Sequence, residues 1–324
     1  MIKPILSICI ATYNRGDYIG ETLDSIIPQL TEEIELLVVD GASTDNTEKV
    51  MQDYLKKSNR LRYVRLPVKG GVDQDYDTTV ELAHGEWCWL FTDDDLFKPG
   101  AIAAVLNAIK KNHSLIVVNA EMRNQDLSTV LEARRIVLYT DKIYDSNAME
   151  RFFIDVDYYL SFIGAVVIRR SIWLSRDRKS YYGTEFIHVG VIFQEPLPET
   201  AVIIAEPYIT IRYGNAQWSA RHFDIWMFKW PKLLWSFKHI SAATKLKVSY
   251  KEPWRKFRVL IYQRSIGYYN PQLYRQYLSP QQSSALWKFC AFSLTLLPVW
   301  ICKGLCEIYF FSKRVRLAIF KDRD

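Results

Sequence analysis

The chain has 324 residues, of which 49% are hydrophobic and 24% are charged, and this length and composition fit a folded protein with a large core and exclude a disordered chain. The formal net charge is +6. Residues 225–324 contain 18 Lys and Arg against 4 Asp and Glu, so residues 1–224 carry a net charge of −8.

Predicted strands and helices alternate through the first 120 residues. Continuous apolar runs predict buried strands, and apolar residues at a spacing of three to four predict amphipathic helices between them. The predicted strands are 5–11, 34–40, 61–66, 87–91 and 115–120, and the predicted helices are 18–30, 48–57, 72–84 and 101–111. This alternation indicates an α/β fold with a mostly parallel sheet and helices on both faces.

Three consecutive carboxylates, Asp93, Asp94 and Asp95, follow the strand 87–91 after one residue, Thr92. Their repulsion grows on burial unless a cation or hydrogen-bond donors compensate it. Mg²⁺ and Mn²⁺ commonly bind one or two protein carboxylates and take their other ligands from water and substrate phosphates. The triplet therefore predicts a metal and diphosphate site, although an acidic turn that caps the helix opened by Pro99 is the alternative.

The ends of neighbouring strands extend this candidate site. Ligands of open parallel sheets bind beyond the carboxyl ends of the strands. We therefore expect residues 12–15, Asp40 and residues 93–95 to share one crevice.

Five cysteines without a zinc spacing or a disulfide framework indicate a reducing compartment. The N-terminal residues lack a secretory signal pattern, so we expect a cytoplasmic catalytic body.

Three segments resemble, in order and spacing, the N-terminal signatures of the family 2 glycosyltransferases. They are SICIATYNR at 7–15, LVVDGASTDNT at 37–47 and TDDDLFKPG at 92–100. The segment GGVDQDY at 70–76 is most similar to the abequosyltransferase-type branch that decorates bacterial O-antigens. The resemblance implies the Rossmann-like GT-A fold of nucleotide-diphospho-sugar transferases. It would occupy residues 1–220, with a nucleotide-sugar half at 1–110 and an acceptor half at 111–220.

The resemblance also implies roles for individual residues. Thr12, Asn14 and Arg15 would line the nucleotide pocket, and Asp40 would accept a hydrogen bond from the base or its ribose. Asp93 would approach the ribose, and Asp94 would bind the metal that bridges the two phosphates. Many members have Asp where this chain has Thr92, which leaves open whether Asp95 also binds the metal or caps the following helix.

The acceptor half contains the candidate general base. Residues 181–188 occupy the place where the family usually carries an acidic pair, and here the only acid is Glu185, with His188 three residues on. In a helix the two side chains would share one face. Inverting transfer needs one group that takes the proton of the acceptor hydroxyl, so Glu185 is the first candidate and His188 the second. Arg212 would contact the donor, and His222 would reach the metal or the diphosphate.

The composition changes from residue 221 onward. Seven of the ten tryptophans lie at or after Trp218, among many basic residues. The run 289–302 is predominantly apolar but shorter than the ~20 residues that span a bilayer, and a basic stretch follows at 313–316. We expect 221–324 to be a helical region that lies on an anionic membrane. A helical bundle that packs on the body or forms a dimer is an alternative, and nucleic-acid binding is disfavoured because the region is too apolar.

The resulting hypothesis is a metal-dependent, inverting glycosyltransferase of the hexosyltransferase type. It would use Mn²⁺ or Mg²⁺ and transfer a sugar from a nucleotide-diphosphate sugar to a polyprenyl-diphosphate-linked saccharide, in the synthesis of lipopolysaccharide O-antigen or capsule. We expect a peripheral protein at the cytoplasmic face of the inner membrane. The alternatives are a non-catalytic protein that binds nucleotide sugar or organises a membrane assembly, and a nucleotidyltransferase, whose Gly-rich basic loop is missing after the first strand.

Overall fold

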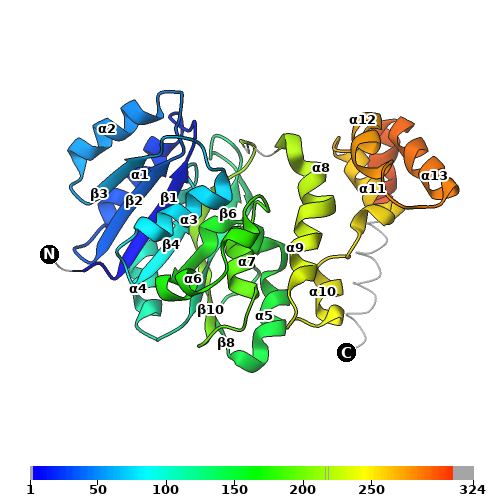
Figure 1. Cartoon of the computed structure of the whole chain (residues 1–324). Coiled ribbons are helices and arrows are strands. Elements are labelled where there is room, and N and C mark those ends of the chain that lie inside the picture. The colour runs from blue at the N-terminus through cyan, green and yellow to red at the C-terminus, as the bar shows by residue number, and fades with distance from the viewer. Residues whose placement is uncertain (1–2, 216, 218, 309–324) are drawn as a thin grey trace. The chain divides into compact units, whose positions relative to one another are not determined.

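The computed structural model describes residues 3–215, 217 and 219–308. Trp218 and the basic stretch 313–316 therefore lie outside the described residues. Figure 1 shows the ribbon with its elements labelled.

The described chain packs as two units. The first contains residues 3–215 and the segment Ser236–Val248, and the second contains the remaining residues from 217 onward. The segment Ser236–Val248 belongs to the first unit because Glu150 accepts hydrogen bonds from the Ser241 amide and the Thr244 hydroxyl, both at 2.7 Å. The expected division at residue 220 into a catalytic domain and a membrane-associating region stays a prediction.

Within the described residues, the first unit contains one ten-stranded sheet. The strand order is β3-β2-β1-β4-β9-β6-β10-β5, with β7 paired to β6 and β8 to β10. The strands are β1 (Leu6–Thr12), β2 (Ile34–Asp40), β3 (Leu61–Arg65), β4 (Trp87–Phe91), β5 (Leu96–Phe97), β6 (Leu115–Arg123), β7 (Val130–Glu132), β8 (Lys142–Tyr144), β9 (Val166–Arg169) and β10 (Ala201–Arg212). β1, β2, β3 and β4 pair in parallel, as do β6 and β10, whereas β9 runs antiparallel to both β4 and β6.

The helices of the described residues follow the predicted order in the first half. They are α1 (Ile19–Ile26), α2 (Thr47–Lys57), α3 (Val72–Leu82), α4 (Ala101–Ile109), α5 (Met149–Val156), α6 (Arg170–Ser175), α7 (Ile187–Phe193), α8 (His222–Asp224), α9 (Trp230–Ser236), α10 (Ala242–Val248), α11 (Phe257–Ser265), α12 (Pro271–Leu273) and α13 (Ala285–Leu296). A further helix follows over Val299–Ile308. The predicted α/β fold with a mostly parallel sheet is confirmed.

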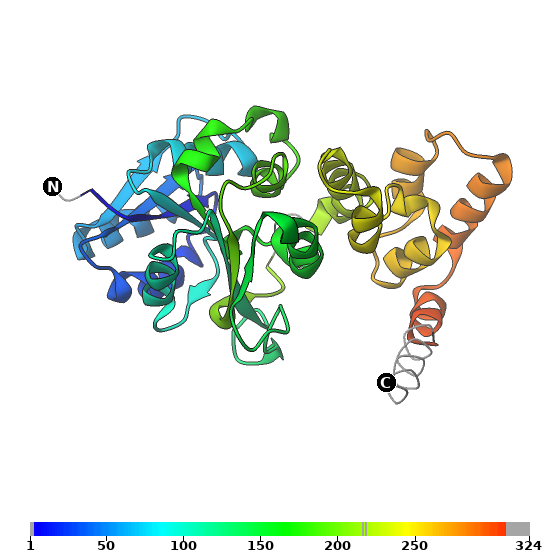
Figure 2. The ribbon, with the colours of Figure 1, turned by 90° about the horizontal axis from the view of Figure 1, so that it is seen from below.

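The order of the strands explains where the ligand crevice lies. The crossovers through α1 and α2 step in the same direction, so right-handed connections place both helices on one face of the sheet. α3 returns from β3 to β4, on the other side of β1, and packs on the opposite face against β1 and β2. Figure 2 shows helices on both sides of the sheet. The chain reverses its direction of winding between β1 and β4, the kind of point at which open α/β sheets bind ligands.

The first predicted helix ends earlier than expected for a local reason. The helix predicted over 18–30 ends at Ile26, and a 3-10 turn follows at Ile27–Gln29. Pro28 lacks an amide hydrogen, so it cannot donate the next hydrogen bond of the helix. In the apolar run before α6, only Val166–Arg169 pairs in the sheet, since Ile163–Ala165 forms a 3-10 turn.

The apolar runs on either side of Glu206 and Pro207 form the single strand β10. Its pairing with β6 is interrupted between Ile204 and Ile209, around Glu206 and Pro207, because proline cannot donate to a sheet ladder. The strand then continues to Arg212, so the interruption does not end the sheet.

The second unit is helical and has its own core. The buried members of this core come from several helices and are Phe223, Met227, Trp254, Leu260, Tyr269, Tyr274, Leu278 and Ala291. Among the described residues, no single helix has the length and apolarity of a membrane span. One pair, Ala285–Leu296 and Val299–Ile308, passes that test only when taken together, and the two helices are bent by 106°.

Candidate active site

The acids that follow β4 are paired with an arginine from the loop after β1. Arg15 places Nε 3.5 Å from Asp93 Oδ1 and Nη2 3.1 Å from Asp94 Oδ2. Asn215, which follows β10, donates from Nδ2 to the same Asp94 oxygen at 2.9 Å, and its carbonyl accepts from Arg15 Nη1 at 3.2 Å. Three segments distant in the sequence thus converge on two carboxylates.

The carboxyl groups carry more negative charge than the arginine neutralises. Burial and the neighbouring Asp94 raise the pKa of Asp93 to about 7, although Arg15 opposes the increase. Burial also raises the pKa of Asp94, although the charge of Arg15 and the hydrogen bond from Asn215 oppose the increase. The Thr12 hydroxyl, at the end of β1, lies close enough to lower the pKa of Asp93 but makes no hydrogen bond of normal geometry. Thr12, Arg15 and the acids therefore lie together, as predicted.

Asp95 points away from its two neighbours into the protein. It is 3% exposed, accepts a hydrogen bond from the Thr92 hydroxyl through Oδ2, and accepts one from the Arg212 amide through Oδ1 at 2.7 Å. Oδ1 thus holds the end of β10, and Oδ2 is occupied within the loop after β4. Arg212 in turn donates from Nε to the Asp94 carbonyl at 3.0 Å and from Nη1 to the Gln125 carbonyl at 2.7 Å.

The loops after β1 and β2 are joined beside this cluster. The Asn14 amide donates to Ser43 Oγ at 2.9 Å, and the Ser43 amide donates to Asp40 Oδ1 at 2.8 Å. Asp40 is fully buried, and its Oδ2 accepts a hydrogen bond from the Tyr63 hydroxyl at 2.6 Å. Asn14 and Asp40 therefore belong to one network, in which Asp40 already has two protein donors. Its contact with a base stays a prediction.

The first turn of α3 completes the crevice. Asp75 accepts from the Gly70 amide at 3.2 Å, and a Cβ on Gly41 would lie 2.7 Å from Asp75 Oδ2. Residue 41 therefore needs to be glycine for α3 to approach the loop after β2. Burial raises the pKa of Asp75 to about 6, and the Asp40 carboxylate contributes to this increase.

Glu185, the first candidate base, precedes α7. It is half-buried on a bend with φ of 74°, and α7 begins only at Ile187. The condition under which Glu185 and His188 would share one helical face is therefore not met, because Glu185 lies outside the helix. The amides of Glu185 and Ile187 both donate to the Asp73 carboxylate at 2.9 Å, so the first turn of α3 connects this segment to the crevice.

His188, the second candidate base, lies inside the protein. It is 1% exposed, and its Nε2 lies 2.7 Å from the Leu160 carbonyl. Burial lowers the pKa of His188 to about 4, so the ring is neutral near pH 7 and Nε2 carries the proton that the carbonyl accepts. This environment favours a structural role, and the role as a base stays a prediction.

His222, a predicted metal contact, belongs to the second unit. Its ring stacks on Tyr268 with centroids 4.0 Å apart, and burial lowers its pKa to about 4, while a hydrogen bond with Gln263 opposes the decrease. Its metal role stays a prediction.

Asp93 and Asp94 fit a hard divalent cation in part. Carboxylate oxygens are the ligands that such ions prefer. Burial is the main cause of the raised pKa values of Asp93 and Asp94, and a bound cation would offset this penalty on the charged forms. No group of three or more His, Cys, Asp or Glu side chains suited to a metal ion is found within the described residues. A cation here would need ligands from a diphosphate and water, and the metal roles of Asp94 and Asp95 stay predictions.

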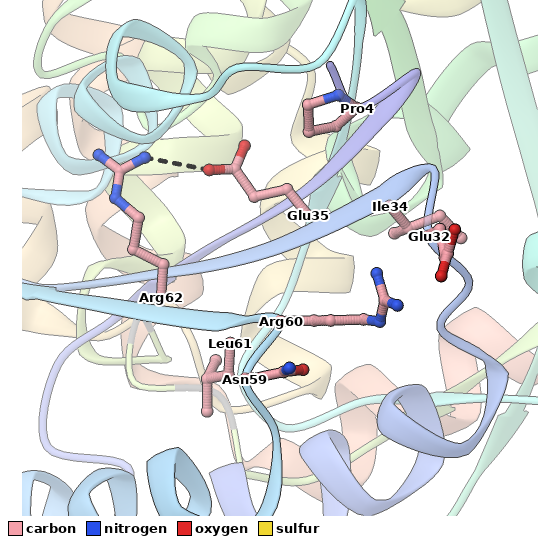
Figure 3. A pocket seen from close by; sticks show the side chains of 8 residues that line it. All are labelled: Pro4, Glu32, Ile34, Glu35, Asn59, Arg60, Leu61 and Arg62. Carbon is pink, nitrogen blue, oxygen red and sulfur yellow. Dashed lines mark hydrogen bonds and ion pairs between the residues drawn. The ribbon is translucent and has the colours of Figure 1, made fainter. Parts of the chain in front are cut away.

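A cavity of about 500 Å³ lies at the opposite end of β2 and β3. Figure 3 shows Glu35 and Arg62 paired in it, with Glu32 and Arg60 nearby. Glu35 Oε2 also accepts from the Ser7 hydroxyl at 2.6 Å. This cluster joins the amino ends of the strands, away from the carboxyl ends that carry the candidate site.

Sequence reasoning missed several residues of the site. The Tyr18 ring lies 5.5 Å from the Arg15 guanidinium carbon and 5.3 Å from that of Arg212, within range of a cation-π interaction with each. Nothing in the local sequence indicates this role. Tyr63 stands near the carboxyl end of β3, and this position next to the Asp40 strand is the signal that could have found it.

The family of the chain follows from its sequence. The model of glycosyl transferase family 2 matches residues 7–172, just over half of the chain. The protein therefore belongs to glycosyltransferase family 2.

Two relatives and a solved structure illustrate the similarity. Abequosyltransferase RfbV of Salmonella typhimurium is 27% identical over 199 residues, which cover 58% of this chain and 60% of RfbV. TuaG of Bacillus subtilis, a putative teichuronic acid biosynthesis glycosyltransferase, is 32% identical over 96 residues, which cover 30% of this chain and 38% of TuaG. The chain thus matches less than two thirds of the length of either relative.

The fold is similar to that of S. aureus TarS 1-349, whose crystal structure was solved in complex with UDP-GlcNAc. The superposition has a TM-score of 0.58 at 14% identity and covers 85% of this chain and 78% of TarS 1-349. Identity at this level shows a shared GT-A-like fold and carries no argument about the substrate.

Proposed function

We propose that this glycosyltransferase moves a sugar from a nucleotide-diphosphate sugar to a hydroxyl of a lipid-linked saccharide, with inversion, in the synthesis of a bacterial surface polysaccharide. The observation that carries the proposal is the cluster of Arg15, Asp93 and Asp94 at the point where the sheet reverses its winding. The names of RfbV and TuaG, a sugar transferase and a teichuronic acid enzyme, support the polysaccharide setting.

The residues of the cluster suit the donor diphosphate. Arg15 supplies a guanidinium, and the carboxylates of Asp93 and Asp94 would hold Mn²⁺ or Mg²⁺ together with the phosphates. The cation would stabilise the charge that develops on the leaving diphosphate. Glu185 is proposed to accept the proton of the acceptor hydroxyl as it attacks the anomeric carbon. Inversion follows because one direct displacement reverses the configuration at that carbon.

A thermal-shift panel tests the donor class. UDP-, GDP-, CDP- and dTDP-sugars are each added with and without Mn²⁺ or Mg²⁺, since a ligand that binds the folded state raises its stability by RT ln(1 + [L]/Kd). We expect one nucleotide to raise the melting temperature only with the cation, and Asp94→Asn to abolish that increase. The exposed Asp53→Asn on α2 is the control. An increase with nucleotide in Asp94→Asn equal to that in the wild type would remove Asp94 from the site.

Membrane attachment through the second unit is the remaining part of the proposal. The bent pair of helices carries large apolar side chains that are between 63% and 73% exposed, namely Leu286, Phe289, Leu296, Trp300 and Ile308. Lys288 and Lys303 lie on the same two helices, and the sequence adds further basic residues beyond them. Apolar side chains beside positive charge favour an anionic bilayer surface, where a polyprenyl-diphosphate-linked acceptor would be found at the cytoplasmic face.

Co-sedimentation with vesicles tests this part. We expect binding to vesicles that contain phosphatidylglycerol, little binding to pure phosphatidylcholine, and a roughly tenfold weaker interaction for Phe289→Ser with Trp300→Ser. The matched control replaces the exposed Val137 and Tyr139 of the first unit with serine. Membrane attachment through these helices would be contradicted if the two double variants bound equally, or if the wild type did not bind. A dimer that hides Phe289 and Trp300 would then be the explanation to test.

A further inference from the structure

α3 presents two buried carboxylates to a segment far along the chain. Asp73 and Asp77 are four residues apart, so they lie on one face of the helix, one turn from each other. They are 3% and 1% exposed. Both accept hydrogen bonds from residues 173–187, the segment that leads through Glu185 into α7.

Asp77 fixes the beginning of this segment. Its Oδ1 accepts from Trp173 Nε1 at 2.8 Å and from Arg178 Nη1 at 2.7 Å. Its Oδ2 accepts from the Tyr182 hydroxyl at 2.6 Å. The pair with Arg178 joins opposite charges at short distance, where hydrogen bonds are strongest, so the chain is tied to α3 at three points before it reaches Glu185.

Asp73 fixes the end of the segment. Its Oδ2 accepts from the Glu185 amide and its Oδ1 from the Ile187 amide, both at 2.9 Å. Glu185 has φ of 74°, in the left-handed region that residues other than glycine rarely adopt. Such a conformation persists only where surrounding contacts hold it, and it is typical of functional sites. Here one carboxylate holds the amides on both sides of Phe186.

Capping of α3 does not explain the position of Asp73. The N-cap of α3 is Gly71, and no side chain caps the helix there. The hydrogen bonds of the Asp73 carboxylate reach across to the other segment. Burial raises the pKa of Asp73 to about 6, partly opposed by the amides of Glu185 and Ile187, so holding a carboxylate here has an energetic cost that the contacts only partly offset.

We propose that Asp73 is a positioning residue of the transferase, which holds the backbone at Glu185 so that the Glu185 carboxylate reaches the acceptor hydroxyl, while Asp77 anchors the start of the same segment. This inference rests on the proposed role of Glu185 as the base. The added point is that α3 ties the proposed base to the loop after β2. Asp75, in the same turn of α3 as Asp73, lies against Gly41 of that loop.

The test compares Asp73→Asn with the wild type in steady-state kinetics and in hydrogen exchange. The asparagine side chain has one acceptor oxygen and so can satisfy only one of the two amides. We expect kcat to fall roughly 100-fold, as a small misplacement of a catalytic group does, with an unchanged Kd for the donor. Faster exchange is expected at the amides of 185–187, and Asp53→Asn on α2 serves as the control for both measurements.

Two outcomes would overturn the inference. One is a wild-type kcat in Asp73→Asn, and the other is a loss of kcat that accompanies faster exchange throughout α3, as expected for general unfolding. If Asp73→Asn fails to fold, Asp73→Glu keeps the charge and moves the carboxylate by one methylene group, and the same fall in kcat is expected.

Glu185→Gln separates the two proposals. Normal turnover in Glu185→Gln would reject the base, whereas the exchange at 185–187 in Asp73→Asn would still report the anchor.

Discussion

The guanidinium of Arg15 lies 3.1 Å from Asp94 and 3.5 Å from Asp93, measured between the nearest charged atoms. The side chains are only 12% and 13% exposed, so water screens this contact weakly. The loop after β1 is therefore held to the acids after β4 by charge.

Replacement of Arg15 by methionine should destabilise the protein. Two partly buried carboxylates would lose their cation, at a cost of about 3 kcal/mol in the free energy of unfolding. The double variant Arg15→Met with Asp94→Asn should recover part of the loss, with a coupling energy of about 1–3 kcal/mol. Urea denaturation of the four proteins of the cycle measures this coupling. Strictly additive effects would show that the contact contributes nothing to stability.

Replacement of Glu185 by glutamine should lower kcat by roughly 10²- to 10⁴-fold, because the amide cannot accept the acceptor proton. The Kd of the donor should stay unchanged, since the proposed role concerns the acceptor. Glu86→Gln is the control, as its side chain is 61% exposed. Turnover within twofold of the wild type would reject Glu185 as the base and direct attention to His188.

Glu35 should stabilise the fold in a pH-dependent way. Burial raises its pKa, but the Ser7 hydroxyl, the His84 amide and charge, and Arg62 outweigh that effect and hold the pKa below its usual value. The folded state thus favours the ionised form. The stabilisation is present above the ordinary pKa, about 4.5, and is lost as the pH falls from there through the lower folded value.

Glu35→Gln should therefore cost about 1–3 kcal/mol at pH 7, and its difference from the wild type should shrink below about pH 4.5. Glu32→Gln, an exposed neighbour at the same cavity, is the matched control. Chemical denaturation between pH 3 and pH 7 provides the measurement. A constant difference over this range would mean that the Glu35 charge does not stabilise the cluster.

Gly41→Ala should disturb the crevice between the loop after β2 and α3. The new methyl group would lie 2.7 Å from Asp75 Oδ2, so we expect a loss of about 1–3 kcal/mol in stability and weaker nucleotide binding. Gly304→Ala is the control, because a Cβ there meets no atom within 4 Å. Melting curves with and without nucleotide separate the two effects, and unchanged curves would show that α3 can move aside.

The sequence predicts the parts of the fold that local patterns determine. β2 and β4 have the predicted bounds, since each is a continuous apolar run that ends at an acid or just before one. The carboxyl ends of parallel strands then bring Arg15 and Asp94 together. The expectation of one crevice follows from this geometry alone.

Features set by distant partners could not be predicted in this way. The sequence leaves open whether the segment before α7 is helical, and the structure shows that Glu185 adopts a left-handed conformation against Asp73, 112 residues earlier. Asp40 has the expected place, yet Tyr63 of the next strand occupies one of its oxygens. Periodicity describes neighbours along the chain, whereas these contacts depend on which elements the finished sheet places together.

The interruption of β10 also determines which way Arg212 points. Between Ile204 and Ile209 the pairing advances five residues along β10 but only two along β6. Side chains alternate between the faces of a strand, so the parity of the inserted residues decides the face on which later side chains emerge. A one-residue deletion here should turn Arg212 away from Asp94 and abolish activity in a protein that still folds, whereas Glu206→Ala keeps the parity and should leave kcat unchanged. The count of residues around Pro207 is thus itself a determinant of the active site.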